Sequence, residues 1–555
     1  MTNRDVAGIL AKIADLLEIK EENIYKIRAY RKAANSILNL DENIVDLYRM
    51  DSIGSIPGVG EAVKTKIEEL IEKGSCEYYE KLLEEIPAGV LDMLSVPGIG
   101  HKTVKLIYEK LGIENLTELS KAVEEKKIRT LPGLGVKTEE KIRRGIEFLN
   151  KNAGQILLGV ALPLAEEFKN YLLEADAVQD ACVVGSIRRG KPLVRDIDVL
   201  VASTTCEGIY ERVVAYRNVK TITSKTSNHI KGQFSGNIDF EVMIVDPRDY
   251  AYFLVWTTGS REHREMLFKN ISKNDLRGCK NEAEIFRKLG LQYIPPELRE
   301  NRGEIKAAYK HEIPKLLDLD DLRGDLHIHS DWSDGAHSIQ DLAVAARKLN
   351  YSYIAVTDHS KSLFISGGLT EERLLAQGEV IDHINSVLKD FRILKGIEVD
   401  ILKDGTLDFS DEILEKLDIV VASVHSSFNL DRETQTQRIV KAMENKHVDI
   451  VGHLTGRLLN RRSAYELDID KILETAAKNK VVLEINSHPD RLDIDEFTAR
   501  RVKEYGIKVA INSDAHHKGD LHFVKYGVLN ARRGWLERED VVNTWSLEEL
   551  LSYFE

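Results

Sequence analysis

Histidine and carboxylate side chains concentrate in the C-terminal part of the chain. Only four of the 16 histidines precede Asp321, and the other 12 follow it. Packing many imidazoles and carboxylates together without a cation would leave buried charge unpaired, which is costly. Nine candidate metal ligands stand at the ends of successive apolar runs: His327, His329, Asp334, His359, Glu398, His425, His453, Asp514 and His516. This set predicts a multinuclear site for Zn²⁺, Mn²⁺ or Fe²⁺, ions that imidazole and carboxylate ligands suit.

Such a site predicts hydrolysis of a phosphoester by residues 321–555. Divalent ions lower the pKa of bound water and neutralise charge on a phosphate group. Arg457 in HLTGRLL and Arg491 in HPDRLD are candidate phosphate clamps, because guanidinium groups pair well with phosphate oxygens. The alternative for each arginine, a surface or loop-anchoring role, stays open.

A second carboxylate set lies upstream. Asp196 and Asp198 flank one residue of an apolar run, so both point to the same face of a strand, and Asp239 lies in another such run. Three carboxylates on adjacent strands suit two Mg²⁺ ions for an in-line phosphoryl displacement. The preceding segment GSIRRG offers backbone amides and a guanidinium to a triphosphate, from Gly185, Ser186 and Arg189.

Short glycine motifs interrupt the N-terminal 150 residues, which otherwise carry apolar residues at helical spacing. Three motifs of the form Pro-Gly-x-Gly recur at intervals of 40 and 35 residues. Their glycines are Gly58, Gly60, Gly98, Gly100, Gly133 and Gly135. The spacing predicts an all-helical quasi-repeat.

Alternating strands and helices predict an α/β barrel after residue 321. Seven apolar runs end in polar residues: GDLHIH, YIAVTDH, ILKGIEVDI, IVVASVHS, DIVGH, VVLEIN and KVAINSDAH. Barrel enzymes carry their chemistry at this end of the strands. Residues 151–245 predict an α+β segment instead. The expected domains are 1–80 (helical), 81–150 (helical), 151–245 (α+β), 246–304 (mixed helix and loop), 305–320 (linker) and 321–555 (barrel).

Composition limits the remaining possibilities. The chain has 555 residues, too many for a single core, with 43% hydrophobic and 30% charged residues. The sequence contains no run of about 18 apolar residues, so we expect no membrane span. The N-terminus does not resemble a signal peptide. Four cysteines without a CxxC pair favour a reducing, cytoplasmic environment. A net charge of −13 argues against nucleic-acid binding by bulk electrostatics.

The C-terminal motifs DLHIHSDWSDG, TDH, GIE, VH, GH and SDAH resemble those of the PHP (polymerase and histidinol phosphatase) domain over about 230 residues. All nine ligand positions of that family are filled. The resemblance implies a distorted seven-stranded barrel and three metal ions. One ion would use His327, His329, Glu398 and Asp514. A second would share Glu398 and add His425 and His453. The third would use Asp334, His359 and His516.

The GSIRRG segment followed by DID resembles the nucleotidyltransferase palm of family X DNA polymerases. The whole chain resembles the bacterial and archaeal form of that family, and the glycine motifs then resemble helix-hairpin-helix elements. The resemblance implies a lyase-like domain at 1–80, fingers at 81–150, a palm at 151–245 and a thumb at 246–304. Such turns bring backbone amides to DNA phosphates without basic side chains. The resemblance implies Mg²⁺ or Mn²⁺ at the palm, deoxynucleoside triphosphates, gapped, nicked or abasic DNA, a monomer, and nucleotide contacts at Gly259 and Ser260. Lys66 aligns with the family's lyase lysine, although a solvated helix lysine is the alternative.

Five residues depart from the family pattern around the nucleotide. Trp256 and Thr257 replace a Tyr-Phe pair, Arg264 an Asn, Arg195 a Gly, and Glu241 an Arg. These changes predict weak or altered polymerase activity and uncertain sugar selectivity.

Two main readings follow from the sequence. The first is a DNA repair enzyme that fills gaps with its palm and uses its barrel as a 3′–5′ exonuclease or abasic-site phosphodiesterase. The second is a nuclease whose impaired palm only holds DNA. A small-molecule phosphatase is a third, more distant class.

Overall fold

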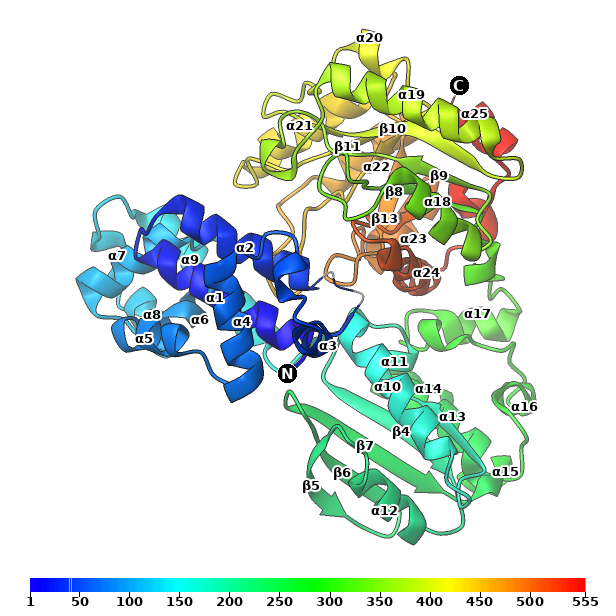
Figure 1. Ribbon diagram of the computed structural model, residues 1–555. Helices are drawn as coiled ribbons and strands as arrows, with labels where there is room; N and C mark the ends of the chain where they lie inside the picture. The colour runs from blue at the N-terminus through cyan, green and yellow to red at the C-terminus, as the bar shows by residue number, and fades with distance from the viewer. Residues whose placement is uncertain (39, 41, 555) are drawn as a thin grey trace. The chain divides into compact units, whose positions relative to one another are not determined.

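The chain divides into two compact units (Figure 1). The computed structural model describes residues 1–38, 40 and 42–554. The first unit comprises Met1–Ala153 with the short segment Asn460–Ser463, and the second comprises Gly154–Leu459 and Ala464–Glu555. Within the described residues, no helix combines the length and the apolar character needed to cross a membrane.

In the described part of Met1–Ala153, all regular secondary structure is helical. Its first helix begins at a capping box, in which Thr2 and Asp5 exchange side-chain-to-backbone hydrogen bonds. One apolar face of that helix is fully buried against the next one, as the helical spacing of its apolar residues predicts. The α-helices are α1 (Asn3–Ile19), α2 (Ile24–Leu38), α3 (Ile44–Arg49), α4 (Glu61–Lys73), α5 (Glu77–Glu85), α6 (Ala88–Asp92), α7 (His101–Leu111), α8 (Leu116–Glu124) and α9 (Val136–Asn152). Short 3₁₀ turns η1 (Ile53–Ser55), η2 (Met93–Ser95) and η3 (Ile128–Thr130) precede the three glycine motifs.

A five-stranded mixed sheet begins the second unit, in the order β2-β4-β7-β6-β5. Its strands are β2 (Asp180–Val183), β4 (Asp196–Ala202), β5 (Val219–Lys225), β6 (His229–Phe234) and β7 (Ile238–Val245), and a separate pair is formed by β1 (Ile156–Leu157) and β3 (Leu193–Val194). Helices α10 (Leu158–Leu173) and α12 (Glu207–Val214) bury one face of the sheet around Phe168. The short helix α11 (Gly185–Arg188) holds the GSIR turn. The α+β character predicted for this segment is confirmed, although β5 and β6 expose many polar residues.

Small helices follow the sheet. They are η4 (Pro247–Asp249), α13 (Tyr250–Thr258), α14 (Arg261–Leu267), α15 (Lys273–Leu276), α16 (Glu282–Lys288), η5 (Pro296–Leu298), α17 (Glu304–Lys310) and η6 (Leu319–Asp321). A buried carboxylate holds this region to the sheet: Glu282 accepts hydrogen bonds from Arg188 and Arg299. Burial alone would raise the pKa of Glu282, but Arg299 and Arg188 lower it to about 2.

The remainder of the second unit is a seven-stranded parallel sheet in the order β14-β13-β12-β11-β10-β9-β8. A bridge between Ile328 and Ala515 brings its two edges together, so the sheet is a nearly closed barrel. The strands are β8 (Gly324–Ile328), β9 (Tyr353–Val356), β10 (Arg392–Asp400), β11 (Ile419–Ser423), β12 (Ile450–Val451), β13 (Val482–Asn486) and β14 (Val509–Asn512). All seven predicted strand–helix units are present, and the predicted fold class is confirmed.

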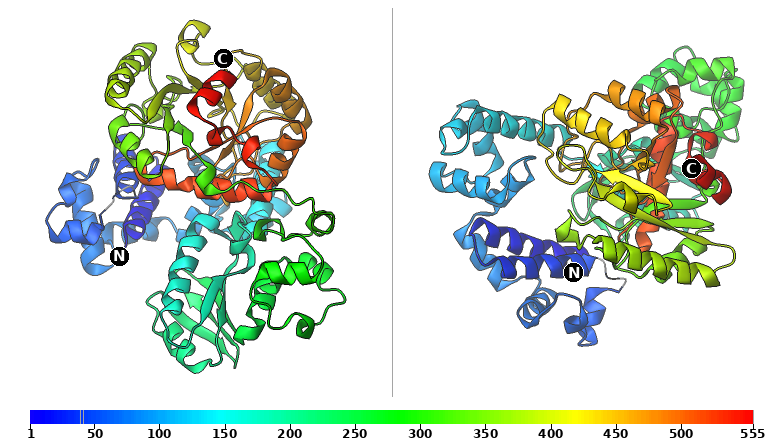
Figure 2. Two further views of the ribbon diagram at one scale, coloured as in Figure 1. Left: turned by 90° about the vertical axis from the view of Figure 1, so that its right-hand side faces the viewer. Right: turned by 90° about the horizontal axis from the view of Figure 1, so that it is seen from above.

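Helices surround the barrel and also cover one of its ends. The surrounding helices and turns are α18 (Ile339–Lys348), η7 (Phe364–Ser366), α19 (Glu371–Val387), α20 (Asp411–Leu414), α21 (Arg432–Met443), α22 (Ile469–Asn479), α23 (Glu496–Glu504), η8 (Lys518–Phe523), α24 (Val524–Arg533), η9 (Arg538–Asp540) and η10 (Val542–Thr544). The last helix, α25 (Leu547–Phe554), buries Leu550 against the interior residues of the barrel (Figure 2). The opposite end, where the strands finish, is left for the candidate ligands.

Candidate active sites

All nine candidate ligands of the barrel lie at the carboxyl ends of its strands or in the loops that follow. Parallel strands place these ends on one rim, so ligands that are distant in sequence meet there. His327 and Glu398 lie within β8 and β10, and both side chains are buried. The others follow a strand: His329 and Asp334 after β8, His359 after β9, His425 after β11, His453 after β12, and Asp514 and His516 after β14.

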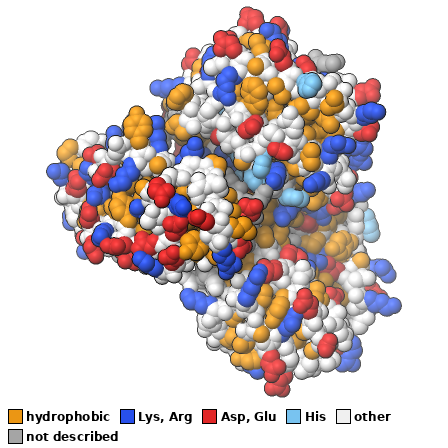
Figure 3. Space-filling model, viewed as in Figure 1, with side chains coloured by type: hydrophobic (Ala, Val, Ile, Leu, Met, Phe, Trp, Pro, Cys, Tyr) orange, Lys and Arg blue, Asp and Glu red, His pale blue; other side chains and the backbone are white. Residues whose placement is uncertain are grey.

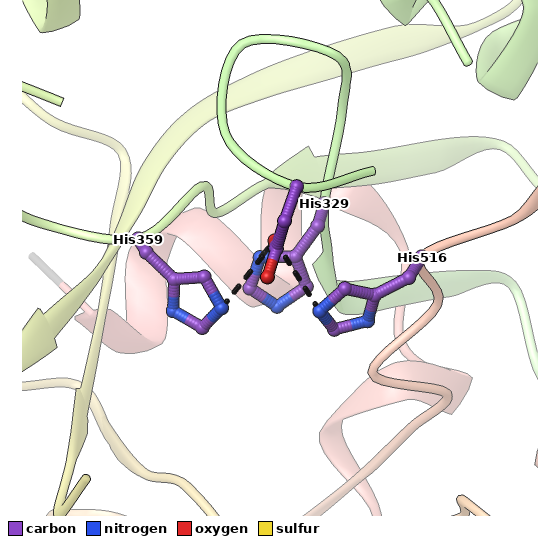
Figure 4. Close-up of side chains that lie close together, drawn as sticks. His329, His359 and His516 are labelled. Carbon is purple, nitrogen blue, oxygen red and sulfur yellow. Dashed lines mark ion pairs between the residues drawn. The ribbon is translucent and has the colours of Figure 1, made fainter. Parts of the chain in front are cut away.

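Three imidazoles surround the carboxylate of Asp334. The Nε2 atoms of His359 and His516 lie 3.5 and 3.4 Å from Asp334 Oδ1. Nδ1 of His329 lies 4.0 Å from the same oxygen. Figure 4 shows the three labelled rings converging on this carboxylate. These four residues each offer one ligand atom within 4.8 Å of the others, which is a suitable arrangement for one metal ion.

Glu398 lies at the centre of the remaining histidines. Its Oε1 atom is 3.0 Å from Nε2 of His453, 3.2 Å from Nε2 of His425 and 3.4 Å from Nε2 of His327. Its Oε2 atom is 2.7 Å from Nδ1 of His359. A carboxylate that contacts four imidazoles through both oxygens is placed to bridge two cations.

Asp514 completes the third group of ligands. Its Oδ1 atom lies 3.1 Å from Nε2 of His329 and 3.7 Å from Nε2 of His327. Both Asp514 and His453 have positive φ angles, of 54° and 26°. A left-handed backbone costs a residue with a side chain about 1–3 kcal/mol, so the surrounding structure must hold both residues in place.

The carboxylates of this cluster are held ionised by the imidazoles. Burial alone would raise the pKa of Glu398, but His425, His327 and His359 lower it well below its ordinary value. Burial alone would lower the pKa of His425, but Glu398 and Asp400 raise it to about 10. Burial alone would also lower the pKa of His516, but Asp334 and Asp514 raise it to about 9. The ionised carboxylates therefore stabilise positive charge next to them.

The donor set fits divalent cations. Nε2 of His327 and Nδ1 of His329 are buried, and neither has a hydrogen-bond partner among the described residues. Buried polar atoms without partners are costly unless an ion or water meets them. Nitrogen and oxygen ligands without sulfur suit Zn²⁺, Mn²⁺ or Fe²⁺.

Three buried carboxylates that the sequence analysis missed support the ligands. Glu484 on β13 accepts a hydrogen bond from Nδ1 of His327 at 2.7 Å. Asp400 faces Nδ1 of His425 at 3.1 Å. Asp358 binds Ser330, Ser333 and Gln377, and so anchors the loop that carries Asp334. The signal for Glu484 was available, because it lies in VVLEIN, one of the apolar runs that end in polar residues.

The two arginines proposed as phosphate clamps have different surroundings. Nε of Arg491 lies 3.5 Å from Oδ2 of Asp514, at the edge of the ligand cluster. Nε of Arg457 donates to the carbonyl of Arg491 at 2.9 Å, and its other nitrogens face the Leu492 carbonyl and Asp495. In this structure Arg457 holds the loop of Arg491.

The mixed sheet brings the three palm aspartates together. β4 and β7 are parallel neighbours, and Asp196 pairs in register with Asp239, while Asp198 pairs with Glu241. Burial, Asp196 and Glu241 together raise the pKa of Asp198 to about 7, and burial, Glu241 and Asp239 raise that of Asp196. Carboxylates that repel one another so closely fit a site for divalent cations.

The GSIR turn lies directly against this cluster. Gly185 has a φ of +66°, and a Cβ there would meet Oδ2 of Asp198 at 2.4 Å. Only glycine allows the turn, with Ser186 next in line, to approach the aspartates so closely. Arg189 is buried and donates to Glu300 at 2.9 Å and to the Thr258 carbonyl at 2.8 Å. In this structure Arg189 is thus committed to protein partners.

Glu241 is not an unpaired fourth carboxylate. Nδ1 of His229 lies 2.5 Å from its Oε1 atom, and Nζ of Lys231 lies 3.0 Å from its Oε2 atom. Both partners come from the adjacent strand β6. The ammonium of Lys231 offsets the charge of Glu241, so the extra repulsion that the sequence suggested at this position is reduced.

Three of the altered residues, Trp256, Thr257 and Arg264, lie at or near the junction of α13 and α14. Trp256 packs against Tyr252 and Phe268, and the guanidinium of Arg264 lies 5.5 Å from its ring centre. Gly259 ends α13, and Ser260 caps α14 by accepting from the His263 amide at 3.1 Å. Trp256 and Arg264 therefore form one stacked surface at this junction.

The three glycine motifs share one backbone conformation. Gly58, Gly98 and Gly133 have φ angles of 83°, 87° and 77°. In each motif the amide after this glycine bonds the carbonyl three residues earlier, at 3.0 to 3.1 Å. The second glycines, Gly60, Gly100 and Gly135, are N-caps of α4, α7 and α9 without side-chain caps, which leaves first-turn amides open to an anion. In Figure 3, acidic and basic side chains are interspersed over the helical unit.

Lys66 lies on α4, one turn into the helix after the first glycine motif. Its ammonium donates to the Ala62 carbonyl at 2.9 Å and lies 5.0 Å from the centre of the Tyr78 ring. Among the described residues, no carboxylate accepts a hydrogen bond from this ammonium. These contacts are compatible with either role considered for it.

Family comparisons agree with this arrangement. Residues 1–76 match the helix-hairpin-helix domain, and residues 90–147 match the SAM-like helix-hairpin-helix tandem. Residues 264–300 match the DNA polymerase beta thumb, and residues 325–488 match the PHP domain.

Relatives fall into two groups. The "DNA polymerase/3'-5' exonuclease PolX" of Bacillus subtilis (strain 168) is 36% identical over 572 residues, covering 100% of this chain and 99% of that protein. A probable phosphatase of Thermoanaerobacter sp. (strain X514) is 31% identical over 231 residues, covering 40% of this chain and 89% of that protein. A probable phosphatase of Shewanella loihica is 31% identical over 205 residues, covering 35% of this chain and 77% of that protein.

Proposed function

This chain belongs to the family X DNA polymerases that carry a PHP domain, and from that premise we propose how its sites divide the work. It is a DNA polymerase and a metal-dependent 3′–5′ exonuclease. The single observation that carries the assignment is the relative that matches this chain from end to end. We assign polymerisation to Asp196, Asp198 and Asp239, and hydrolysis to the nine ligands of the barrel.

At the barrel, the residues would hold up to three ions of Zn²⁺, Mn²⁺ or Fe²⁺. These ions, when bound, activate water and neutralise charge on the phosphate. Asp334, His359 and His516 with His329 would hold one ion. Glu398, with Asp514, His327, His425 and His453, would hold the others. Arg491, beside Asp514, is placed to pair with a phosphate oxygen of the substrate. Arg457 fixes the loop from which Arg491 projects.

At the palm, the three aspartates would hold Mg²⁺ or Mn²⁺. Bound there, these ions align a triphosphate with an attacking hydroxyl and neutralise developing charge. The amides of Gly185 and Ser186 lie close enough to the aspartates to contact the same triphosphate. Arg189 would have to exchange Glu300 for a phosphate oxygen in order to join them.

We propose that incorporation by the palm is weak or altered in sugar selectivity. Trp256 and Arg264 form a stacked surface in the stretch that contacts the sugar in this family. A bulky indole and a guanidinium there change the shape and charge of the pocket. Gly259 and Ser260 shape the adjoining turn and stay our candidates for nucleotide contacts.

For its role in the cell, we propose DNA repair. The enzyme would fill gaps and trim 3′ ends or hydrolyse abasic-site phosphodiesters. The helix-hairpin-helix turns would bind the backbone of gapped, nicked or abasic DNA through open amides. We further propose that the protein acts as a monomer in the cytoplasm. Lys66 stays our candidate for a lyase residue.

The alternative of an inactive palm that only holds DNA is not favoured. The three aspartates, the Gly185 turn and the thumb are all present, and Glu241 is compensated by Lys231 and His229. The probable phosphatase of Thermoanaerobacter matches only 40% of this chain, so that activity leaves most of the chain without a role.

Primer extension and 3′ digestion of one gapped duplex test this division. We expect Asp198→Ala to abolish extension and leave digestion intact, and His327→Ala to do the reverse. Extension that is unmeasurable in the unmodified enzyme with dNTPs, NTPs or Mn²⁺ would contradict the polymerase assignment. Digestion that persists in the His327→Ala enzyme would contradict the barrel assignment.

A further inference from the structure

Glu484 is a buried carboxylate that takes no place among the nine ligands. It lies on β13 with no exposed surface, and its Oε1 atom is 2.7 Å from Nδ1 of His327. Its Oε2 atom accepts the backbone N–H of His453 at 2.7 Å. One side chain thus contacts two candidate ligands that come from different strands.

The two nitrogens of His327 face different partners. Nδ1 faces Glu484, whereas Nε2 points into the cluster, 3.4 Å from Glu398 and 3.7 Å from Asp514. A carboxylate only accepts hydrogen bonds, so Nδ1 must carry the hydrogen and donate it to Glu484. The lone pair of Nε2 is then left free to bind a cation.

Further hydrogen bonds fix the position of Glu484. The side-chain amides of Asn512 and Asn486 donate to it, at 3.0 and 3.3 Å, and Asn486 also donates to Asp514 at 3.0 Å. Such outer partners of metal-binding histidines set the ring orientation. Their mutation typically weakens metal binding by about 10- to 100-fold.

We propose that Glu484 is a positioning residue of the exonuclease centre, which fixes the tautomer of His327 and the backbone of His453 for metal binding. This inference rests on the proposed metal-binding role of the barrel. Asp400 makes the same kind of contact, with Nδ1 of His425 at 3.1 Å, while Nε2 of His425 faces Glu398. The repeated geometry supports a role for these carboxylates in orienting rings.

The test is metal affinity of the full-length protein, measured by competition with a chelator for Zn²⁺ and for Mn²⁺. We expect Glu484→Gln to weaken the tightest site by about 10- to 100-fold, because an amide repels the His453 N–H or fails to accept from Nδ1. Glu484→Asp keeps the charge but withdraws it by one methylene, and should weaken binding by about tenfold. Primer extension should not change in either variant.

Asp449→Asn is the matched control. Asp449 precedes β12 in the same barrel and accepts the Val420 N–H at 2.8 Å, but it contacts no candidate ligand in the described structure. Metal affinity equal to that of the unmodified protein in both Glu484 variants, with an unchanged thermal transition, would overturn the inference. If the unmodified protein itself binds no divalent ion, the proposed function fails instead. If Glu484→Gln does not fold, the Asp variant decides.

A second, independent observation concerns Phe364 and Ile365. They are 88% and 96% exposed, the highest values among the large hydrophobic side chains of the described residues. Single exposed apolar residues are common, but two in succession beside a catalytic centre are not explained by packing.

The loop that carries them is held directly at the exonuclease centre. The Leu369 N–H donates to the carbonyl of His359 at 2.8 Å, and the Ser360 N–H donates to that of Glu398 at 3.1 Å. The hydroxyl and the backbone N–H of Ser362 donate to the carboxylate of Asp408, at 2.5 and 2.6 Å. The base of this loop is therefore held at two ligands, and Phe364 and Ile365 project from it into solvent.

We infer that Phe364 and Ile365 contact the terminal base at the 3′ end of the DNA strand being digested. This inference also rests on the proposed exonuclease role. An aromatic ring contributes about 1–3 kcal/mol by stacking on one base, and it tolerates every sequence. An apolar wedge also separates a terminal base from its partner, which lets the last phosphodiester reach the metal site.

Digestion of single-stranded and of fully paired 3′ ends by a Phe364→Ala/Ile365→Ala enzyme tests this contact. We expect KM to rise about tenfold for both, and the fluorescence of a 3′-terminal 2-aminopurine to lose its quenching on binding. Hydrolysis of bis(p-nitrophenyl) phosphate, which lacks a base, should stay unchanged, and Phe497→Ala is the control for loss of an exposed aromatic ring. Unchanged KM and quenching would overturn the inference, whereas loss of hydrolysis by the unmodified enzyme would count against the metal centre itself.

Discussion

At the scale of single residues, Glu398 is the carboxylate at the centre of the exonuclease site. It is almost fully buried and contacts His327, His359, His425 and His453. Most of its neighbours gain or keep positive charge because of it. Its charge and its two oxygens both matter for binding a pair of cations.

Replacing Glu398 by Gln should therefore remove metal and activity together. We expect exonuclease kcat to fall by more than about 100-fold, because a neutral amide cannot bridge two cations. Metal content by mass spectrometry should fall by at least one ion per chain, and primer extension should stay within about twofold. The exposed Glu415→Gln change is the control. Full metal content in the Glu398→Gln protein would be incompatible with a bridging role.

Asp449 gives a prediction about stability and pH. Burial raises its pKa to about 7 in the folded chain, against 3.8 as the ordinary value. Since the folded pKa is the higher one, ionisation opposes folding, and stability is lost as the pH rises from about 4 to 7. The Asn variant avoids that loss. Its melting temperature should exceed that of the unmodified protein at pH 8 by about 2–4 °C, corresponding to roughly 1 kcal/mol, and by much less at pH 4.5. Equal differences at both pH values would contradict the assignment.

Residue types and spacing predicted which side chains meet, but not their partners. The nine ligands were identifiable because they end successive strands, and strand ends of a parallel barrel share a rim. Arg189 was expected at a triphosphate, yet Glu300, 111 positions away, holds it here. Glu241 likewise gained Lys231 and His229 only through the register of β6 and β7. Pairings of this kind depend on tertiary contacts that no local pattern encodes.

At the scale of elements, the glycine turns carry the DNA-binding proposal. Each turn uses a left-handed glycine to end one helical segment and a second glycine to begin the next. The pattern Pro-Gly-x-Gly predicted these turns, because φ above zero favours glycine. The strands β5 and β6 were harder to predict, since their exposed polar residues obscure the alternation expected of a half-buried strand.

Gly133→Ala should weaken DNA binding without changing its salt dependence. The φ of +77° strains an alanine by about 1 kcal/mol, although a Cβ there meets no atom within 4 Å. The turn would shift and misplace the amides that face phosphates. We expect Kd for gapped DNA to rise about 3- to 10-fold by fluorescence anisotropy.

The slope of log Kd against log salt should remain the same, because no charge is removed. Gly112→Ala is the matched control, since Gly112 also has a positive φ of 63° and open space but ends α7 outside the motifs. An equal loss of binding in both variants would attribute the effect to general strain in the unit.

At the scale of the whole molecule, two compact units divide the chain, and the second contains both metal-binding candidates. The barrel accounts for the similarity to probable phosphatases, and the entire chain accounts for the similarity to PolX. The domain boundaries expected inside each unit, at residues 80, 245, 304 and 320, stay predictions.

Metal removal should destabilise only the second unit. A ligand that binds the folded state at 100 times its Kd stabilises it by about 2.7 kcal/mol. We expect calorimetry with EDTA to lower the melting temperature of the second unit by several degrees. The transition of the helical unit, which carries none of the candidate metal groups found among the described residues, should not move. A shift of the helical transition alone would contradict this distribution of ions.

The most direct test of the account is anomalous scattering from crystals of the manganese-loaded protein. We expect strong peaks about 2.0–2.3 Å from the side chains of Asp334, His359 and His516 and from both oxygens of Glu398. A fully loaded crystal with no peak near either carboxylate would contradict the central claim that this rim is a metal-dependent nuclease centre.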